Sequence, residues 1–140
     1  MGLSTTVFKA FIAGNVWVFR KTGGKLGSQG GKVVLVTTTG RKSGLERTSP
    51  LMGIADGDRI LVAASAGGGD RHPAWYHNLV ANPRVTVERG ADKLAMIARV
   101  AGPEERPELW QRFKDASKAF TKYETRTDRE IPVVILEPTS

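Results

Sequence analysis

Six short apolar runs, most of them bounded by glycine, aspartate or asparagine turns, follow one another from residue 32 onward. Runs rich in β-branched residues between such turns are typical of strands. They do not alternate regularly with helical patterns, as the strands of a doubly wound parallel sheet would. The expected strands are 32–39, 48–55, 59–65, 84–89, 93–100 and 131–136. The pattern predicts a mainly β protein of the α+β class, built as an antiparallel barrel.

Three segments have the spacing of apolar residues that favours helices. Residues 4–20 form an amphipathic pattern, residues 73–81 form a short helix that a proline ends, and a further helix is expected to begin at Pro103. The 140 residues of the chain suit one domain. The expected organisation is an N-terminal amphipathic helix over 1–21, a glycine-rich joint over 22–31 and a barrel over 32–140.

The residue types that the chain lacks exclude several kinds of catalyst. The absence of cysteine excludes disulfides, thiolate metal sites and cysteine nucleophiles, and favours the cytoplasm. The only histidines, His72 and His77, stand five apart without an acidic cluster, so we expect no metal site. The Gly-x-Ser-x-Gly sequence of serine hydrolases is also absent. Demanding chemistry would therefore have to come from an organic cofactor.

Positive charge is concentrated in the first third of the chain. Residues 1–48 contain eight of the 21 Lys and Arg residues but only one of the 14 acids, Glu46. A one-sided basic region needs an anionic partner, which can be nucleic acid, a membrane surface or a small ligand with phosphates or carboxylates. We do not expect nucleic acid, because aromatic residues are not interleaved with the basic ones along the expected strands.

Three motifs have the residue types of a cofactor site. Residues 40–44 hold two cations and a hydroxyl between glycines, which suits a phosphate or carboxylate, although a solvated hairpin turn has the same composition. Residues 63–69 have small side chains, which let a flat ring approach the backbone. Residues 73–79 place Trp75, expected in the core, on one short helix with Asn78, whose amide is a candidate for the polar edge of a ligand.

These motifs occur in a definite order along the chain. They read Thr-Thr-Thr-Gly-Arg-Lys-Ser-Gly over 37–44, Ser-Pro-Leu over 49–51, Ala-Ser at 64–65, Pro-Ala-Trp-Tyr-His-Asn-Leu over 73–79, Asn-Pro at 82–83 and Thr-Asp-Arg over 127–129. The combination resembles the deazaflavin (F420)-dependent nitroreductase family, in its quinone reductase branch, from about residue 15 to residue 138. The resemblance implies a split β-barrel that binds coenzyme F420 and reduces quinones, nitroimidazoles or unsaturated lactones such as coumarins and aflatoxins.

The resemblance also implies which residues hold the coenzyme. Its phosphate side is expected at residues 41–43 and its ring near residues 63–66, and its anionic groups account for some of the N-terminal charge imbalance. The expected cofactor-binding residues are Arg41, Lys42, Ser43, Arg47, Thr48, Ser49, Pro50, Leu51, Met52, Ala63, Ala64, Ser65, Ala66, Ala74, Trp75, Tyr76, His77, Asn78 and Phe120.

On the acceptor side, we expect Tyr123 and, as a weaker candidate, Tyr76 to donate hydrogen bonds. Hydride transfer from a deazaflavin needs a stacked acceptor and a donor that stabilises the developing negative charge. Met52, Ala66 and Phe120 replace polar residues of the nitroreductase members, which removes hydrogen-bond donors from the acceptor pocket.

The sequence is also compatible with other functions. A split-barrel oxidoreductase that uses FMN would have the same fold, and a non-enzymatic carrier of deazaflavin or lipid would bind without turnover. Residues 1–20 are expected to contact the inner face of the cell membrane, to cap the barrel or to form a dimer contact. The chain is expected to be a monomer or a homodimer.

Overall fold

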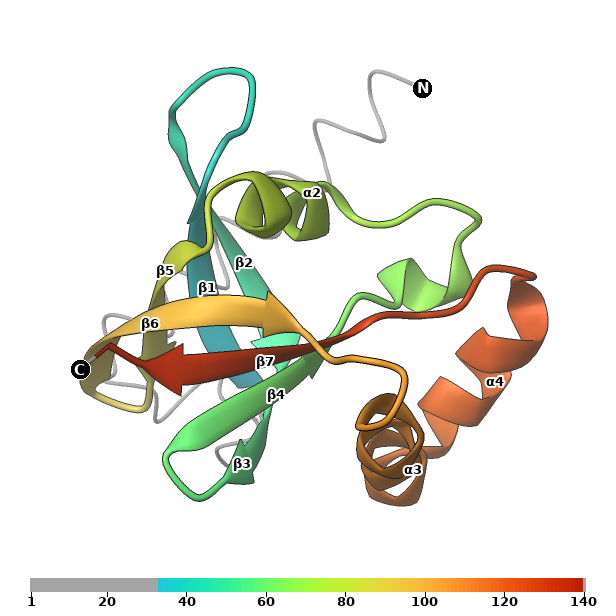
Figure 1. Ribbon diagram of the computed structural model, residues 1–140. Helices are drawn as coiled ribbons and strands as arrows, with labels where there is room; N and C mark the ends of the chain where they lie inside the picture. The colour runs from blue at the N-terminus through green and yellow to red at the C-terminus, as the bar shows by residue number, and fades with distance from the viewer. Residues whose placement is uncertain (1–32, 140) are drawn as a thin grey trace.

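The computed structural model describes residues 33–139, in which one antiparallel sheet carries the helices (Figure 1). The strands are β1 (Val33–Thr39), β2 (Glu46–Met52), β3 (Ile54–Asp56), β4 (Arg59–Ala63), β5 (Arg84–Arg89), β6 (Asp92–Val100) and β7 (Val133–Pro138). Their order in the sheet is β2-β1-β5-β6-β7-β4-β3, and all neighbouring pairs are antiparallel. The predicted α+β class and antiparallel arrangement are confirmed.

The two edge strands of this sheet, β2 and β3, are consecutive in the chain and have only Gly53 between them. Since one residue cannot span a flat sheet of seven strands, the sheet curls until its edges approach each other. At Gly53 an added Cβ would lie 3.1 Å from Cγ2 of Ile60 and 3.2 Å from Cγ2 of Val34, so the backbone passes close to the interior. The result is a half-barrel, which agrees with the predicted split β-barrel.

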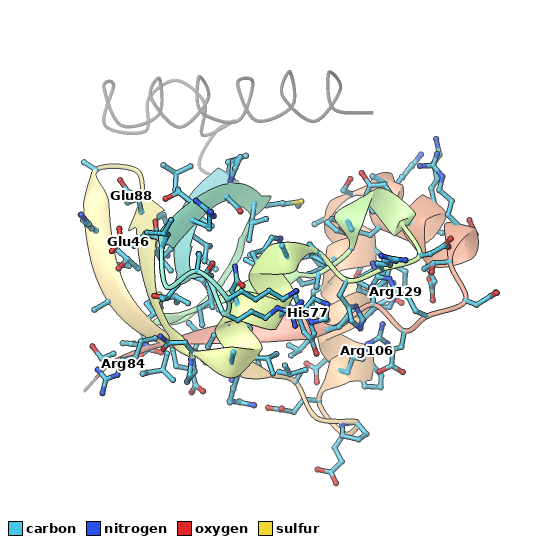
Figure 2. The ribbon with its side chains drawn as sticks, turned by 90° about the horizontal axis from the view of Figure 1, so that it is seen from above. Glu46, His77, Arg84, Glu88, Arg106 and Arg129 are labelled. Carbon is cyan, nitrogen blue, oxygen red and sulfur yellow. The ribbon has the colours of Figure 1, made fainter. Side chains whose placement is uncertain are left out.

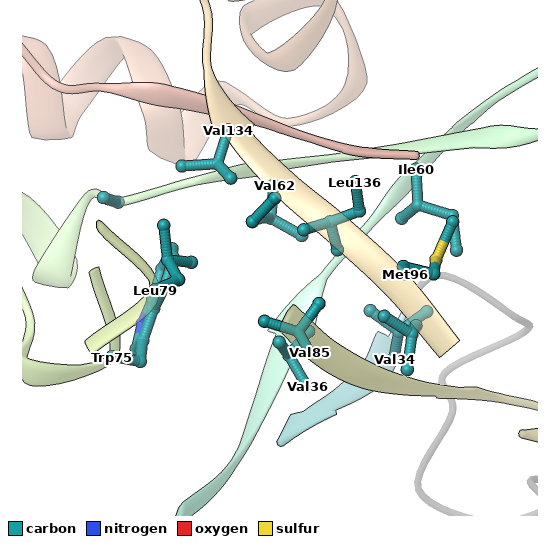
Figure 3. Close-up of a cluster of buried hydrophobic side chains, with 13 residues drawn as sticks. Val34, Val36, Ile60, Val62, Trp75, Leu79, Val85, Met96, Val134 and Leu136 are labelled. Atoms are coloured by element: carbon teal, nitrogen blue, oxygen red, sulfur yellow. The ribbon is translucent and has the colours of Figure 1, made fainter. Parts of the chain in front are cut away.

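Strands β4 and β7 are buried on both faces, which explains why their sequences are continuous apolar runs without alternation. On the inner face, the core shown in Figure 3 consists of Val34, Val36, Ile60, Val62, Ala64, Trp75, Leu79, Val85, Val87, Met96, Ala98, Val134 and Leu136. On the outer face, a second cluster consists of Leu61, Leu109, Trp110, Phe113, Phe120, Ile131, Val133 and Ile135. The pair β4–β7 therefore forms the wall between two cores.

The helices of the described chain are η1 (Ala66–Gly68, a 3-10 turn), α2 (Ala74–Ala81), α3 (Arg106–Ala116) and α4 (Lys118–Arg126). Helix α2 covers one end of the half-barrel, whereas α3 and α4 lie together beside β4 and β7 (Figure 1). Helices α3 and α4 are separated by Ser117, whose backbone is extended (φ −154°, ψ 130°). Its Oγ accepts the N–H of Ala119 at 3.3 Å and so caps α4.

The predicted boundaries were wrong in several places. The strand predicted over 48–55 is divided at Gly53, so the sheet has seven strands. The strand predicted over 59–65 ends at Ala63, and the last strand begins at Val133, because Pro132 has no N–H for the ladder. The helix predicted from Pro103 begins at Arg106, and α4 follows it as a helix that the prediction lacked.

The predicted N-terminal helix and glycine-rich joint lie outside the described residues. Between residues 33 and 139, none of the helices has the length and apolar character needed to cross a bilayer.

Candidate cofactor site

The turn between β1 and β2, residues 40–45, is closed by its own backbone. The N–H of Gly40 donates to the carbonyl of Leu45 (2.7 Å), and the N–H of Gly44 donates to the carbonyl of Gly40 (2.8 Å). An added Cβ at Gly40 would lie 2.6 Å from Oγ of Ser43. Only glycine therefore lets this hydroxyl fold back, where it accepts the N–H of Leu45 at 3.1 Å. The basic motif of residues 40–44 therefore lies in a turn that its own hydrogen bonds order; we call residues 40–45 the basic turn.

Helix α2 holds this turn in place through Asn78, which is only 7% exposed. Its Oδ1 accepts the backbone N–H of Arg41 at 3.1 Å, and its Nδ2 donates to Oγ1 of the buried Thr38 at 3.5 Å. A buried amide without partners would be costly, so these two bonds favour one position of the turn relative to α2. The amide that was predicted to meet a ligand positions the basic turn.

The turn presents positive charge to solvent. The side chains of Arg41, Lys42 and Ser43 are exposed. Within residues 33–139, Arg41 and Lys42 form no ion pair, and the backbone N–H groups of Lys42 and Ser43 form no hydrogen bond. Unpaired cations and N–H groups gathered at one turn are suited to binding a phosphate or carboxylate.

The loop of residues 64–72 connects β4 to α2 and contains the small-residue motif. Its start is fixed by a bond from the N–H of Ala64 to the carbonyl of Pro132 (2.9 Å). Ala66 (φ 47°), Gly67 (φ 64°) and Gly68 (φ 81°) then lie in the left-handed region. For Ala66 this backbone is strained, and such strain persists only where the surroundings determine it. The conformation of this loop is therefore held by the residues around it.

Helix α4 packs directly against this loop at Gly68, which is buried. An added Cβ at Gly68 would lie 3.0 Å from Cα of Tyr123 and 3.0 Å from Cβ of Arg126. The helix that carries the predicted donor Tyr123 therefore touches the loop predicted to hold the ring.

Arg129, in the connection between α4 and β7, makes the most hydrogen bonds to the loop; it is labelled in Figure 2. Its Nε donates to the carbonyl of Gly69 (2.9 Å), its NH2 nitrogen to that of Ser65 (2.8 Å) and its NH1 nitrogen to that of Ala64 (3.1 Å). The NH1 nitrogen also lies 2.8 Å from Nδ1 of His72. One side chain thus joins both ends of the loop.

A cluster of rings adjoins Arg129 at the start of α2. The ring of His72 lies 4.7 Å from that of Tyr76 and 5.7 Å from that of His77, measured between centroids. Burial, followed by the electrostatic effects of Arg129 and His77, lowers the pKa of His72 below its usual value. Burial also lowers the pKa of Arg129, whose guanidinium nevertheless stays charged.

The other predicted cofactor residues fall into three environments. Strand β2 carries Arg47, which is exposed, and residues 48–52, which are half-buried. The rings of Trp75 and Phe120 belong to the inner and outer cores respectively, as was expected of Trp75. Ala63 and Ser65 are half-buried, Ala64 is buried, and Ala66 and Ala74 are exposed. Asn78 thus joins the basic turn to α2, and Arg129 holds the loop of residues 64–72 that leads into the same helix, whereas Phe120 belongs to the outer core.

Two residues of this region, Arg129 and His72, were not among the predicted site residues. Arg129 entered only as part of a motif, and His72 only as one of two histidines that were not expected to bind a metal. A loop rich in glycine has carbonyls that its own backbone leaves without donors, and buried carbonyls need partners. A glycine-rich loop therefore indicates that a donor side chain is needed nearby, but the sequence does not show which arginine supplies it.

The described residues suit a flat ring with an anionic tail, because exposed cations stand at the turn and side chains without bulk line the loop. The class of protein is thus a split-barrel-like α+β fold with a candidate cofactor site at α2. The family model described as F420H(2)-dependent quinone reductase matches residues 12–138. The chain belongs to this family, and it is therefore an F420-dependent oxidoreductase.

Individual proteins show the same relationship. An F420H(2)-dependent quinone reductase of Mycobacterium tuberculosis is 38% identical over 126 residues, which cover 85% of this chain and 84% of the relative. The solved structure of an F420-H2 dependent reductase is 43% identical with a TM-score of 0.70, covering 76% of this chain and 94% of that one. A structure described as a domain-swapped dimer, also 43% identical, has a TM-score of 0.71 and covers 76% and 80% of the two chains. The FMN alternative gains no support from the family match.

Proposed function

We propose that this chain transfers a hydride from reduced F420 to a quinone or another flat activated alkene, such as a coumarin-like or aflatoxin-like lactone. The observation that carries the proposal is the basic turn that Asn78 holds against α2, together with a small-residue loop that leads into the same helix. A coenzyme with a phosphodiester, a carboxylate tail and a flat ring requires cations for its anionic groups. It also requires a backbone segment with small side chains that the ring can approach.

The proposed cofactor-binding residues have different roles, which follow from their chemistry. Arg41 and Lys42, with the hydroxyl of Ser43, hold the anionic groups, and the exposed Arg47 adds charge at the start of β2. Residues 63–66 form the surface on which the ring rests. This assignment explains why cations that form no ion pair within residues 33–139 are kept at a turn whose backbone is closely determined.

When bound, reduced F420 supplies the hydride. The chain has to hold a flat acceptor and stabilise the negative charge that develops on the acceptor oxygen, to which a proton is then added. Tyr123 and Tyr76 are both half-buried, and no hydrogen bond occupies either hydroxyl within the described residues. They are the proposed donors, and Tyr123 is the stronger candidate because α4 contacts the loop.

The surroundings of Tyr123 favour an apolar acceptor. Its ring packs on Phe120 at 5.7 Å, and Met52 packs against the same outer core. Few polar groups are therefore available to bind the oxygens of a nitro group. We rank quinones and activated alkenes above nitroaromatics as acceptors.

The test is a titration of the purified protein with reduced F420, reduced FMN and NADPH, followed by fluorescence. Menadione is then added and oxidation of the bound cofactor is recorded. Tight binding of reduced F420 alone, followed by its oxidation, is the expected result. A preference for FMN would replace the proposal with a flavoprotein, and F420 binding without oxidation by any acceptor would replace it with a carrier.

Two proposals about assembly go with this function. A homodimer is supported by the domain-swapped dimer seen for the similar chain, and light scattering of the purified protein tests it. Contact of residues 1–20 with the cell membrane would bring the enzyme to lipid-soluble quinones. Cosedimentation with anionic vesicles, compared between chains with and without residues 1–20, tests that contact.

A further inference from the structure

Arg129 is held in an unusual chemical environment for a charged side chain. Its partners are three backbone carbonyls and one imidazole nitrogen, and no carboxylate lies within ion-pair distance of it among residues 33–139. A partly buried guanidinium without a carboxylate is costly unless its N–H groups are well satisfied. Four N–H donations meet this need, and all of them go to the loop of residues 64–72.

The contact with His72 determines the protonation of that ring. A guanidinium can only donate hydrogen bonds, so Nδ1 of His72, at 2.8 Å, has to accept one. A nitrogen that accepts carries no proton, and the neutral imidazole then has its proton on Nε2. His72 is therefore held as a neutral ring whose one N–H is on Nε2.

Two of the titratable groups around His72 oppose its protonation. Arg129 from the α4–β7 connection and His77 from α2 both lower the pKa of His72, after burial. The ring of Tyr76 lies against it at 4.7 Å, and Asp70 lies in the same loop and acts on Arg129. A second proton, added at Nδ1, would turn an accepted hydrogen bond into a contact between two cations.

We propose that Arg129 is a positioning residue of the F420 site. Through the carbonyls of Ala64, Ser65 and Gly69 it sets the shape of the loop on which the ring rests. Through Nδ1 it keeps His72 neutral, with the Nε2–H as a donor for a carbonyl or anionic oxygen of the coenzyme or the acceptor. The inference rests on the proposed function for its ligand, but the state of His72 follows from contacts within the chain.

The first experiment measures His72 without any cofactor. Long-range ¹⁵N–¹H NMR of the full chain reports which imidazole nitrogen carries the proton, and the Arg129→Gln variant and a His72→Asn variant for assignment are compared with it. We expect Nε2 to be protonated in the wild-type protein at pH 7.5. We expect a mixture of tautomers in Arg129→Gln, together with a rise in the pKa of His72. A protonated Nδ1 in the wild-type protein would overturn the proposal.

The second experiment measures the affinity for reduced F420 by fluorescence titration. Arg129→Gln is expected to weaken binding at least tenfold, and Arg129→Lys, which keeps the charge but not the fork of donors, is expected to lie between Gln and the wild type. Arg129→Lys also serves if Arg129→Gln does not fold. Affinities within twofold of the wild type in both variants would overturn the positioning role.

The matched control is Arg106→Gln. Arg106 is also partly buried and donates twice to one backbone carbonyl, that of Ile131, at 2.9 and 2.7 Å, but it makes no bond to the loop. The Arg106→Gln variant is expected to be less stable than the wild type, with the same tautomer of His72 and the same affinity for F420. Equal effects of the Arg106 and Arg129 substitutions would reduce Arg129 to a general structural residue. If the wild-type protein binds no F420 but His72 shows the expected tautomer, the proposed function fails, whereas the contact between Arg129 and His72 is confirmed.

Discussion

The backbone N–H of Arg41 donates to Oδ1 of Asn78 across 3.1 Å, and this bond joins the basic turn to helix α2. The two residues are 37 positions apart, and the bond is made by a side chain that is only 7% exposed. Because the amide also binds Thr38 at the end of β1, it orders the turn from two sides. Anion binding at residues 41–43 therefore depends on a residue of another element.

Replacement of Asn78 by Leu tests this dependence. The substitution leaves the N–H of Arg41 and the buried hydroxyl of Thr38 without their partner, which should lower the free energy of unfolding by about 1–3 kcal/mol. It should also weaken F420 binding. The control is Asn82→Leu, which removes a weaker bond of 3.4 Å to the N–H of Arg84 outside the turn. Urea denaturation and F420 titration measure both effects, and equal losses of affinity in the two variants would contradict the positioning of the turn.

The basic turn should contribute affinity through charge. In the double variant Arg41→Gln, Lys42→Gln we expect F420 affinity to fall and its dependence on salt to become weaker, because two exposed cations no longer meet the anionic groups. Stability should change little, since both side chains are exposed and unpaired among residues 33–139. Titrations at low and high salt measure the effect, with Arg84→Gln as an exposed cation elsewhere. An unchanged salt dependence would argue against this binding mode.

The contact between the loop and α4 can be tested at two neighbouring glycines. Gly67→Ala places a Cβ in open space and costs only the left-handed backbone, about 1–2 kcal/mol. Gly68→Ala has the same backbone cost and also meets Cα and O of Tyr123 at 3.0 and 3.1 Å. Gly68→Ala should therefore destabilise the protein clearly more and reduce turnover. Thermal unfolding of the two variants compares them directly. An equal shift in melting temperature would show that α4 can move away from the added Cβ without loss of stability.

The hydroxyl of Tyr123 should matter for turnover rather than for cofactor binding. Tyr123→Phe keeps the ring packing on Phe120 and removes only the donor. We expect a lower kcat with menadione and a nearly unchanged Kd for F420. Tyr76→Phe is the comparison, with a smaller effect expected. Parallel losses in kcat and F420 affinity would place Tyr123 at the cofactor instead of the acceptor.

The lowered pKa of His72 makes stability depend on pH. In the unfolded chain this ring takes up a proton near its usual pKa of about 6.5, whereas in the folded protein it does so only at a lower pH. Between these two values the unfolded state binds more protons, so stability falls as the pH falls. Urea denaturation at pH 7.5 and 5.5 measures this loss. His72→Asn, whose amide oxygen can accept from Arg129, should reduce it, and His77→Asn should reduce it less, because His77 is the smallest of the three causes that lower the pKa of His72.

Several features of the fold could be predicted because they depend on local sequence. Pro83 and the turn at Gly90 and Ala91 bound β5, so this strand was predicted over its observed range of 84–89. The proline after Asn82 likewise set the end of α2. Helix α4 was not predicted, although Ser117 is a residue type favoured at helix N-termini; the packing of Phe120 on Phe113 and Trp110 favours the change of direction there.

The sequence by itself determined the strand pattern, the basic turn, the small-residue loop and, through its ordered motifs, the family. Only the tertiary structure decided that Asn78 anchors the turn and that Arg129 holds the loop and His72. These bonds join residues between 37 and 65 positions apart. A local pattern records that a turn or a loop is present, because backbone preference acts over a few neighbours. It cannot record which distant donor satisfies that loop, because the pairing depends on how the curled sheet brings β4, α2 and the segment before β7 together.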